Sequence, residues 1–196
     1  MVNDSHKLSD AEIIRRVIEG DVNAFEDLLK RYEQHVLNIL KKHIPHIQIE
    51  ETAQEVFFRA YQGLPTVKQT GSFKQWISAV AIRACYDFWR RQYRSREIPM
   101  SDLTERHRRW LEDVISDQSD RSYHENRLQK EASELLDWAL GKLSAADRMV
   151  FELVYLEGLS GRETADLLGW SVANVKVRSH RCRKKIKKLI SEFMAA

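Results

Sequence analysis

The chain has 196 residues, 43% of them hydrophobic, and a formal net charge of +3. It is long enough for one large domain or two small ones, and its apolar runs are too short for a membrane span. The first ten residues, MVNDSHKLSD, are polar and include acids, unlike a secretory signal. We therefore expect a cytoplasmic protein with no direct membrane insertion. In that compartment Cys85 and Cys182 are expected to be buried, reduced thiols, with a disulfide as the less favoured alternative.

The first half of the chain predicts four amphipathic helices and no strand. Their boundaries are marked by residues that cap or break helices: the capping-box pairs Ser9–Glu12 and Ser72–Gln75, the cap Asp21 and the break Pro45. Apolar side chains recur along each segment at the spacing of one helix face. Because such faces can cover one another, we expect a compact helical domain over residues 8–95.

The second half predicts a linker followed by another helical domain. Residues 96–129 mix acids and bases with scattered apolar residues, so we expect a linker with one short helix. Helical periodicity then returns, and Ser144, with Asp147 three residues later, caps the next helix. The second domain spans residues 130–194. The expected fold class is all-α, with two small helical domains joined by a linker.

Residues 155–189 have the order of elements that a DNA-reading helix-turn-helix requires. Ser160 and Glu163 form a capping box, Gly169 suits a left-handed turn, and Ser171 caps the final helix. At about 100° per residue, the apolar residues of that helix fall in one inward sector: Val175, Cys182, Ile186 and Leu189. The opposite face is expected to meet a partner through Lys176, Val177, His180, Arg181, Lys184 and Lys188.

The positive charge of the chain is concentrated in this final helix. From residue 171 onward there are eight Lys or Arg residues and one acid, which gives +7. Since the whole chain carries +3, residues 1–170 carry −4. A local basic surface that follows a capped turn favours DNA as the partner. By itself, the same charge also fits a solvated C-terminal helix.

Two further surfaces of the first domain are candidates for partner contacts. The end of the fourth helix, from Arg83 to Arg96, mixes aromatic residues with arginines, which suits single-stranded or distorted DNA. The alternative is a core aromatic pair beside a solvated helix end. On the third helix an outward cluster is either a partner surface or ordinary solvated charge: Glu50, Glu51, Gln54, Glu55 and Phe58.

Three segments of the chain resemble the extracytoplasmic-function (ECF) sigma factors, the short group of the sigma-70 family. They are EETAQEVFFRAYQGL, GSFKQWISAVAIRACYDFWRRQYR and LSAADRMVFELVYLEGLSGRETADLLGWSVANVKVRSHRCRK. The resemblance extends over nearly the whole chain and implies a region-two domain joined by a linker to a region-four domain. The implied function is to bind core RNA polymerase and direct promoter recognition, capture of the −10 element and transcription initiation.

The resemblance also implies roles for individual residues. The surface that grips the clamp helices of the polymerase β′ subunit corresponds to Glu51, Gln54, Glu55 and Phe58. The −10 element of the promoter is expected at Arg83, Ala84 and Asp87, which shape the pocket for an unstacked base, and at Arg90, Arg91 and Arg94, which contact its backbone. The −35 element is expected at Lys176, Val177, His180 and Arg181, with Arg178 and Arg183 on its phosphates.

The implied partners are core polymerase, through its β′ clamp helices and β flap, promoter DNA, and an anti-sigma factor that covers these surfaces. No cofactor, metal or catalytic activity is implied. Three positions depart from the family pattern. Ala145 replaces a proline, Ser179 replaces a leucine or isoleucine, and Arg83 replaces an asparagine that many members carry, which leaves the base preferred by the pocket open.

Two other function classes compete with this interpretation. A transcriptional activator would carry the same helix-turn-helix behind a sensing domain, but no ligand or phosphoacceptor pattern precedes residue 130. An enzyme would need a nucleophile with its base, a phosphate-binding glycine loop or paired carboxylates, and none of these patterns is present. His43 and His46, on either side of Pro45, could ligate a metal, but we expect them to be exposed loop residues.

Overall fold

The computed structural model describes residues 8–67, 72–95 and 135–194, and every regular element among them is helical. The first domain contains α1 (Asp10–Ile18), α2 (Phe25–His43), α3 (Ile49–Gly63) and α4 (Phe73–Ser95), with the 3-10 turns η1 (Val22–Ala24), η2 (His46–Gln48) and η3 (Leu64–Thr66). The second contains a helical segment at 135–141, then α7 (Ala145–Phe151), the π turn η4 (Glu152–Leu156), α8 (Gly161–Leu168) and α9 (Val172–Met194). The all-α prediction is confirmed. The expected linker, residues 96–129, lies outside the described residues.

Capping boxes start two of the helices as the sequence predicts. In α1 the Ser9 hydroxyl accepts from the Glu12 N–H at 3.3 Å, and the Glu12 carboxylate accepts from the Ser9 N–H at 2.8 Å. In α8 the same pair of bonds joins Ser160 and Glu163, at 3.2 and 2.8 Å. Each box satisfies amide groups that a helix start leaves unpaired, and a cap of this kind contributes about 1 kcal/mol.

The prediction that Asp21 caps α2 is wrong. The Asp21 side chain makes no capping hydrogen bond, and its carboxylate pairs with Arg16 of α1 at 3.0 Å. The turn η1 separates Asp21 from the start of α2 at Phe25. A cap must stand directly before the first turn of its helix, so Asp21 is too far away to serve α2.

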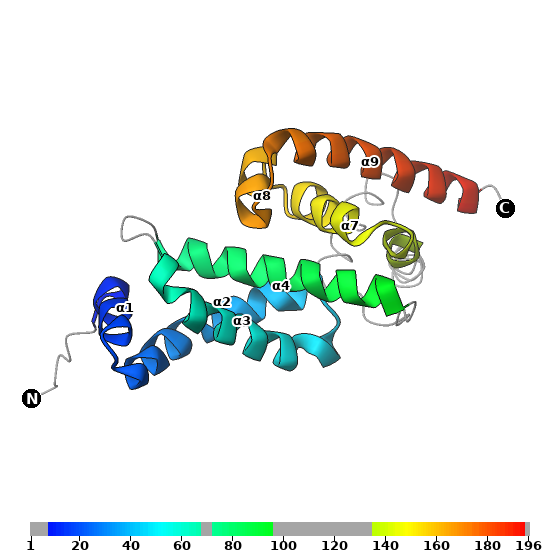
Figure 1. Ribbon diagram of the computed structural model, residues 1–196. Helices are drawn as coiled ribbons and strands as arrows, with labels where there is room; N and C mark the ends of the chain where they lie inside the picture. Colours follow the sequence, from blue (N-terminus) through cyan, green and yellow to red (C-terminus); the bar gives the residue numbers. More distant parts are fainter. Residues whose placement is uncertain (1–7, 68–71, 96–134, 195–196) are drawn as a thin grey trace, which may run out of the picture.

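Helix α4 lies at the centre of the molecule. Helices α2 and α3 pack on one side of it and α7 and α8 on the other, while α9 lies farther out over α7 and α8 (Figure 1). One continuous apolar core runs through these layers: it includes Ile77, Ala84 and Phe88 of α4 together with Met149 and Leu168 of the second domain. A smaller cluster beneath α9 holds Leu136, Leu140, Cys182 and Ile186. The two domains therefore share a core in this conformation.

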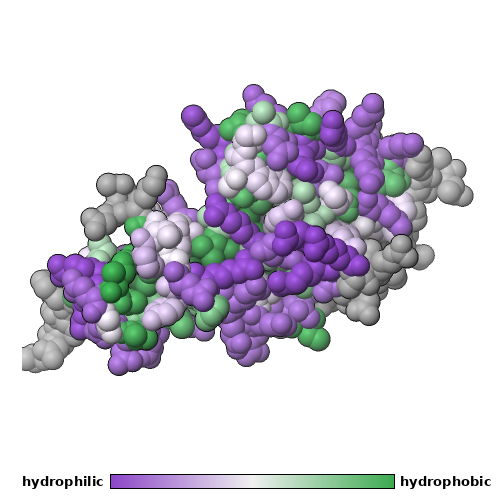
Figure 2. All heavy atoms as spheres, in the orientation of Figure 1, coloured by the Kyte–Doolittle hydropathy of each residue, from purple (hydrophilic) through white to green (hydrophobic). Residues whose placement is uncertain are grey.

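Hydrophilic side chains project along the α9 ridge and across the face where α4 meets the second domain (Figure 2). None of the helices in the described ranges has the length and apolarity that a bilayer crossing requires. Cys85 and Cys182 are both buried and free, as expected. Burial raises the pKa of both thiols, that of Cys182 to about 12.

Candidate nucleic-acid and polymerase interfaces

Helix α9 presents the outward face that its sequence predicts. Gly169 ends α8 in the left-handed conformation, with φ 73° and ψ 33°, and the Ser171 hydroxyl then accepts from the Asn174 N–H at 3.2 Å. Val175, Cys182 and Ile186 are at most 4% exposed. The residues on the opposite face are all exposed: Lys176, Val177, His180, Arg181, Lys184 and Lys188. The helix is therefore anchored on one side and open to a partner on the other.

The two arginines expected to hold phosphates differ in their surroundings. Arg178 donates to the Asp147 carboxylate at 2.7 Å and to the Asn174 side chain at 3.0 Å. Arg183 is exposed, and its guanidinium lies 6.0 Å from the centre of the Tyr155 ring. Arg183 can therefore reach a phosphate directly, whereas Arg178 must first release Asp147.

Ser179, which departs from the family pattern, is accommodated by hydrogen bonds. Its hydroxyl donates to the carbonyl oxygen of Lys176 at 3.1 Å, and its own carbonyl accepts from the Tyr155 hydroxyl at 3.2 Å. The Tyr155 side chain thus ties this part of α9 to the second domain. Ala145 is equally well tolerated, because the Ser144 hydroxyl accepts from the Asp147 N–H at 3.2 Å and starts α7 without a proline.

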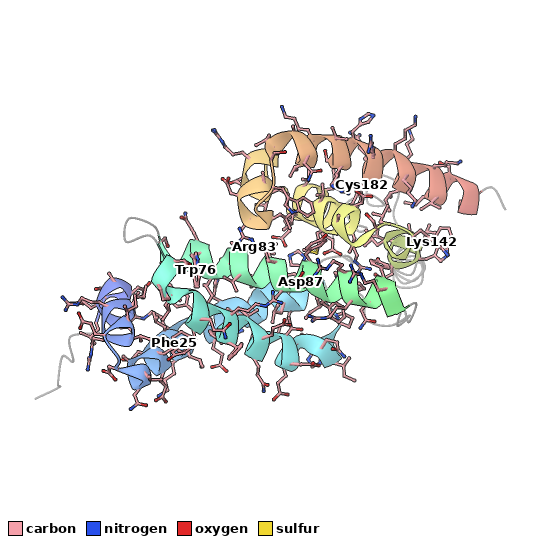
Figure 3. All side chains as sticks on the ribbon, viewed as in Figure 1. Phe25, Trp76, Arg83, Asp87, Lys142 and Cys182 are labelled. Carbon is pink, nitrogen blue, oxygen red and sulfur yellow. The ribbon has the colours of Figure 1, made fainter. Side chains whose placement is uncertain are left out.

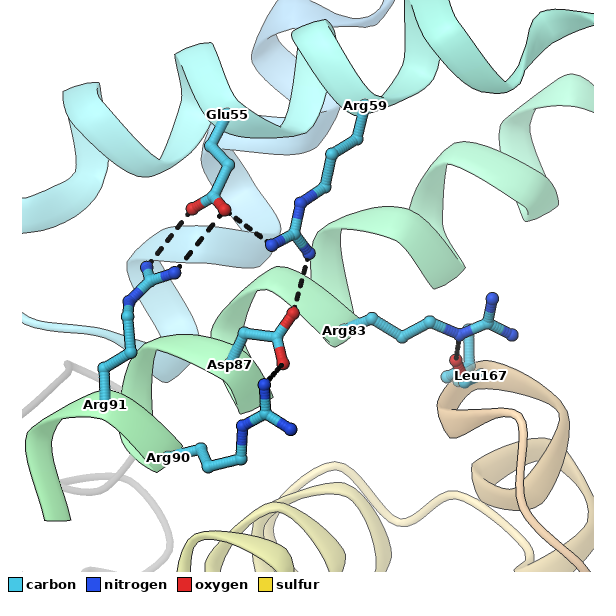
Figure 4. A network of polar contacts seen from close by, with 7 residues as sticks. All are labelled: Glu55, Arg59, Arg83, Asp87, Arg90, Arg91 and Leu167. Atoms are coloured by element: carbon cyan, nitrogen blue, oxygen red, sulfur yellow. Dashed lines mark hydrogen bonds and ion pairs between the residues drawn. The ribbon is translucent and has the colours of Figure 1, made fainter. Parts of the chain in front are cut away.

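In the first domain, Arg59 joins two predicted site residues that lie on different helices. From α3 its guanidinium donates to Glu55 at 2.5 Å and across to Asp87 of α4 at 2.8 Å (Figure 4). Arg91 approaches the Glu55 carboxylate at 3.2 Å, and Arg90 approaches Asp87 at 3.4 Å. We call these five residues the α3–α4 network. It connects the expected polymerase surface with the expected −10 surface.

The arginines keep Glu55 ionised. Partial burial acts to raise the pKa of Glu55, but the hydrogen bonds and charges of Arg91 and Arg59 outweigh it and bring the pKa below its usual range. Burial likewise opposes the charge of Arg59, yet Asp87 and Glu55 raise its pKa. The sequence analysis missed Arg59, although its position four residues after Glu55 on a helix is the spacing of an ion pair.

The other predicted residues of the first domain are not all surface groups. Gln54 and Phe58 are exposed on α3, Phe58 by 62%. Arg94 is exposed on α4, whereas Ala84 is fully buried and belongs to the core. Arg83 points from α4 toward the second domain (Figure 3), where its Nε donates to the carbonyl oxygen of Leu167 at 3.1 Å. Glu51, like Gln54, is exposed on α3. Ala84 can shape a binding surface only from behind, because it is buried.

The expectation that His43 is an exposed loop residue is wrong. It is the last residue of α2 and only 2% exposed, because the second domain covers it. Its Nδ1 lies 2.8 Å from Glu152 and its Nε2 lies 2.7 Å from Glu157. His46 is exposed, as expected. No group of three or more potential metal ligands comes together in the described ranges.

Arg148 completes this interdomain cluster, and Trp89 packs against it. Arg148 of α7 donates to the second oxygen of Glu152 at 2.8 Å, and its guanidinium lies 3.6 Å from the centre of the Trp89 ring. The Trp89 indole N–H donates to the His43 carbonyl at 2.8 Å. We call His43, Arg148, Glu152 and Glu157 the His43 cluster. His43 lies more than a hundred residues from the other three in the sequence, so no local pattern could reveal the cluster.

Two family models match the chain, and both describe one family. The model of Sigma-70 region 2 matches residues 28–95, and the model of Sigma-70 region 4 matches residues 133–186. The chain belongs to the sigma-70 family. The first match contains the α3–α4 network, and the second contains the outward face of α9 as far as Lys184. Members of the family are transcription initiation factors, not catalysts.

Two relatives place the chain in the ECF group of sigma factors. The ECF RNA polymerase sigma-E factor of Escherichia coli strain K12 is 26% identical over 182 residues, which are 93% of this chain and 94% of the relative. The protein of the same name from Haemophilus influenzae is 27% identical over 204 aligned positions, covering 97% and 100%. The resemblance stated from the sequence motifs is thereby confirmed.

A solved structure supports the fold. The structure of CnrH in complex with the cytosolic domain of CnrY matches with a TM-score of 0.51 and 23% sequence identity. The match covers 93% of this chain and 97% of that chain. This sigma factor therefore shares its overall helical arrangement with CnrH.

Proposed function

We propose that this sigma factor binds core RNA polymerase and directs it to promoters through surfaces on both of its domains. The first domain contacts the polymerase and captures the −10 element, and the second reads the −35 element. The outward face of α9 is the observation that carries the proposal. This face is basic and exposed. A capped turn leads into the helix, and the opposite face of the helix is buried. This is the geometry of a recognition helix in the major groove.

The residues of α9 fit a division between base reading and phosphate contact. Lys176 and Arg181 can reach guanine acceptors in the major groove, and the exposed methyl groups of Val177 suit the methyl group of thymine. Arg183 is available for the flanking phosphates, which position the helix without reading sequence. Because such contacts release counterions, binding through this domain should weaken as salt is added.

The polymerase contact is best supported by Phe58. A large aromatic side chain that is 62% exposed, with the polar residues Glu51 and Gln54 on the same helix, resembles the centre of a protein interface more than ordinary surface. Both relatives carry RNA polymerase in their names. We assign this face of α3 to the β′ clamp helices, and we assign the β flap to the second domain.

On α4, the exposed arginines Arg90, Arg91 and Arg94 fit the backbone of the −10 element. Arg83 and Asp87 lie on the same helix and would frame the pocket for an unstacked base, with Ala84 behind them. An extruded base loses its stacking, so the pocket must replace that energy with hydrogen bonds and new stacking contacts.

We further propose that an anti-sigma factor covers these surfaces in the cytoplasm until a signal arrives, and that the polymerase alone supplies catalysis.

Run-off transcription with bacterial core polymerase and a promoter library tests the proposal. The chain should confer start-site selection on a subset of promoters. A Gln54→Ala/Phe58→Ala variant should lose core binding and transcription while its second domain keeps its affinity for −35 duplex DNA. Ile47→Ala is the matched control, because Ile47 is 82% exposed and lies outside the assigned face. The assignment would be overturned if the chain conferred start-site selection on none of the core polymerases tested. It would also be overturned if the two variants bound core polymerase equally well.

A further inference from the structure

The second domain packs against the part of α4 that the proposed function assigns to an unstacked base, although Arg83 stays exposed. Arg83 is held by the carbonyl oxygen of Leu167 at 3.1 Å, and the Tyr86 ring meets the Trp170 ring edge-on, with centroids 5.5 Å apart. The turn at Gly169 is so close that a Cβ there would lie 3.0 Å from the Arg83 guanidinium. Figure 3 shows Arg83 in this seam between α4 and α8. The turn after α8 therefore lies against Arg83, on the helix where the proposed function places the base.

The His43 cluster fastens the same seam farther along α4. His43 belongs to the first domain, and its three charged partners, Arg148, Glu152 and Glu157, belong to the second. All four side chains are at most 15% exposed. With His43 protonated the cluster holds two positive and two negative charges. Separating the domains takes Glu152 and Glu157 away from His43, so water must replace both of its charged partners, whereas Arg148 keeps Glu152 within the second domain.

We infer that the His43 cluster is a latch that holds the sigma factor closed, and that the latch must release before α4 can take up promoter DNA. The latch itself is a property of the two domains, and only its consequence for DNA rests on the proposed function. A ligand that binds the open state alone has an apparent affinity reduced by the fraction of molecules that are open. Closure thus lowers promoter binding without any contact to the DNA.

The charges around His43 make the latch sensitive to pH. Glu152 of η4 and Glu157, the residue after η4, face the imidazole, and Arg148 of α7 pairs with Glu152 from behind. From α4 the nearby titratable groups are Cys85 and Tyr93, whose raised pKa values keep both neutral near pH 7. Asp137 lies beyond Arg148, at 3.9 Å. Burial acts to lower the pKa of His43, but the hydrogen bonds and charges of the two glutamates raise it to about 9.

The direction of the pH effect follows from this raised pKa. In an open molecule, where water reaches His43, its pKa returns toward the ordinary 6.5. Below pH 6.5, protonated His43 therefore stabilises the closed state in full. This stabilisation of the closed state is lost as the pH rises through about 9. Between these values the ratio of closed to open molecules falls by up to about tenfold for each pH unit.

The experiment measures the distance between the domains by energy transfer between two dyes. The dyes are attached at Glu33→Cys in α2 and Lys187→Cys in α9, both exposed positions. The native thiols are buried and react slowly, so labelling is selective. Transfer should be high at pH 6.5 and fall toward pH 9. In His43→Gln, which keeps a polar side chain but no charge, transfer should be low throughout. His46→Gln, which alters an exposed histidine of η2, should behave like the parent.

Glu157→Gln is a second variant that keeps the test valid if His43→Gln does not fold. Glu157 lies at the rim of the second domain, so its replacement leaves the apolar core intact. It should shift the opening to lower pH while the helical circular dichroism is unchanged. Equal transfer in the parent, His43→Gln and Glu157→Gln across this range would overturn the latch.

A second readout separates the latch from the proposed function. Binding of a short single-stranded DNA should strengthen several-fold in His43→Gln if α4 is the DNA surface. Opening without stronger DNA binding would leave the latch intact and remove α4 from the proposed function. Stronger DNA binding without opening would overturn the latch.

Discussion

Two groups of charged side chains surround α4, and they differ in how much water reaches them. The His43 cluster is almost completely buried, whereas members of the α3–α4 network, such as Arg91 and Arg90, are more than half exposed. Buried ion pairs cost several kcal/mol per unpaired charge when one partner is removed, but exposed pairs contribute about 0–1 kcal/mol. The buried group can therefore hold a conformation. The exposed group can exchange its partners for phosphates or polymerase side chains at low cost.

The largest effect is expected when one charge of the buried group is removed. Arg148→Ala leaves Glu152 without its guanidinium and strips Trp89 of its stacking partner, so the free energy of unfolding should fall by about 3–5 kcal/mol. Urea unfolding of the full chain measures it. Arg148→Met keeps the contact with Trp89 but not the charge, and Arg162→Ala changes an exposed arginine as a control. A loss below about 1 kcal/mol in Arg148→Ala would mean that water reaches the cluster.

A pH titration of stability should give the next largest effect. Because the pKa of His43 rises to about 9 in the folded chain, its protonation contributes on the order of 3 kcal/mol. This stability is present in full below about pH 6.5 and is lost as pH rises to about 9. In the parent, the urea concentration at the midpoint of unfolding should fall as the pH rises across this range. His43→Gln should lose most of that slope, and an unchanged slope would place the titrating group elsewhere.

A smaller effect is expected on the outward face of α9, where Arg181 is exposed. Arg181→Ala should weaken binding of the cognate −35 duplex by about 1–3 kcal/mol and relax discrimination at one base pair. Titration of the parent and the variant with single-base promoter variants measures both quantities. An equal loss on every promoter variant would make Arg181 a phosphate contact, the role assigned to Arg183.

The smallest loss of stability is expected in the α3–α4 network, in contrast to the buried His43 cluster. Arg59→Met removes the central cation of the α3–α4 network, but Glu55 keeps Arg91 and Asp87 keeps Arg90. Because water screens these pairs, the free energy of unfolding should fall by no more than about 1 kcal/mol. Thermal unfolding measures it. A loss as large as that of Arg148→Ala would show that the network, too, is structural.

Local patterns in the sequence predicted the helices and the outward face of α9. Capping boxes and helical periodicity involve residues three or four positions apart, so Ser160 with Glu163 was sufficient to start α8. The same rule failed at Asp21, because a turn intervenes that has no strong signature of its own. Residues at one end of a helix are thus easier to predict than the path between two helices.

Contacts between the domains could not be predicted from the sequence. His43 and Glu152 lie on different domains, and each by itself has the polarity of a surface residue. Only the packing of α7 against α4 buries them together.

The π turn η4 has a consequence for how this sigma factor can vary. Residues five apart in an α-helix point roughly 140° away from each other. The wider turn, closed by the Glu157 N–H on the Glu152 carbonyl at 2.9 Å, lets both carboxylates grip one imidazole. Regular α-helical winding over the same residues would turn Glu157 roughly 140° away from Glu152 and out of reach of the imidazole. A regular turn at this point would thus give a constitutively accessible initiation factor in place of a self-shielding one.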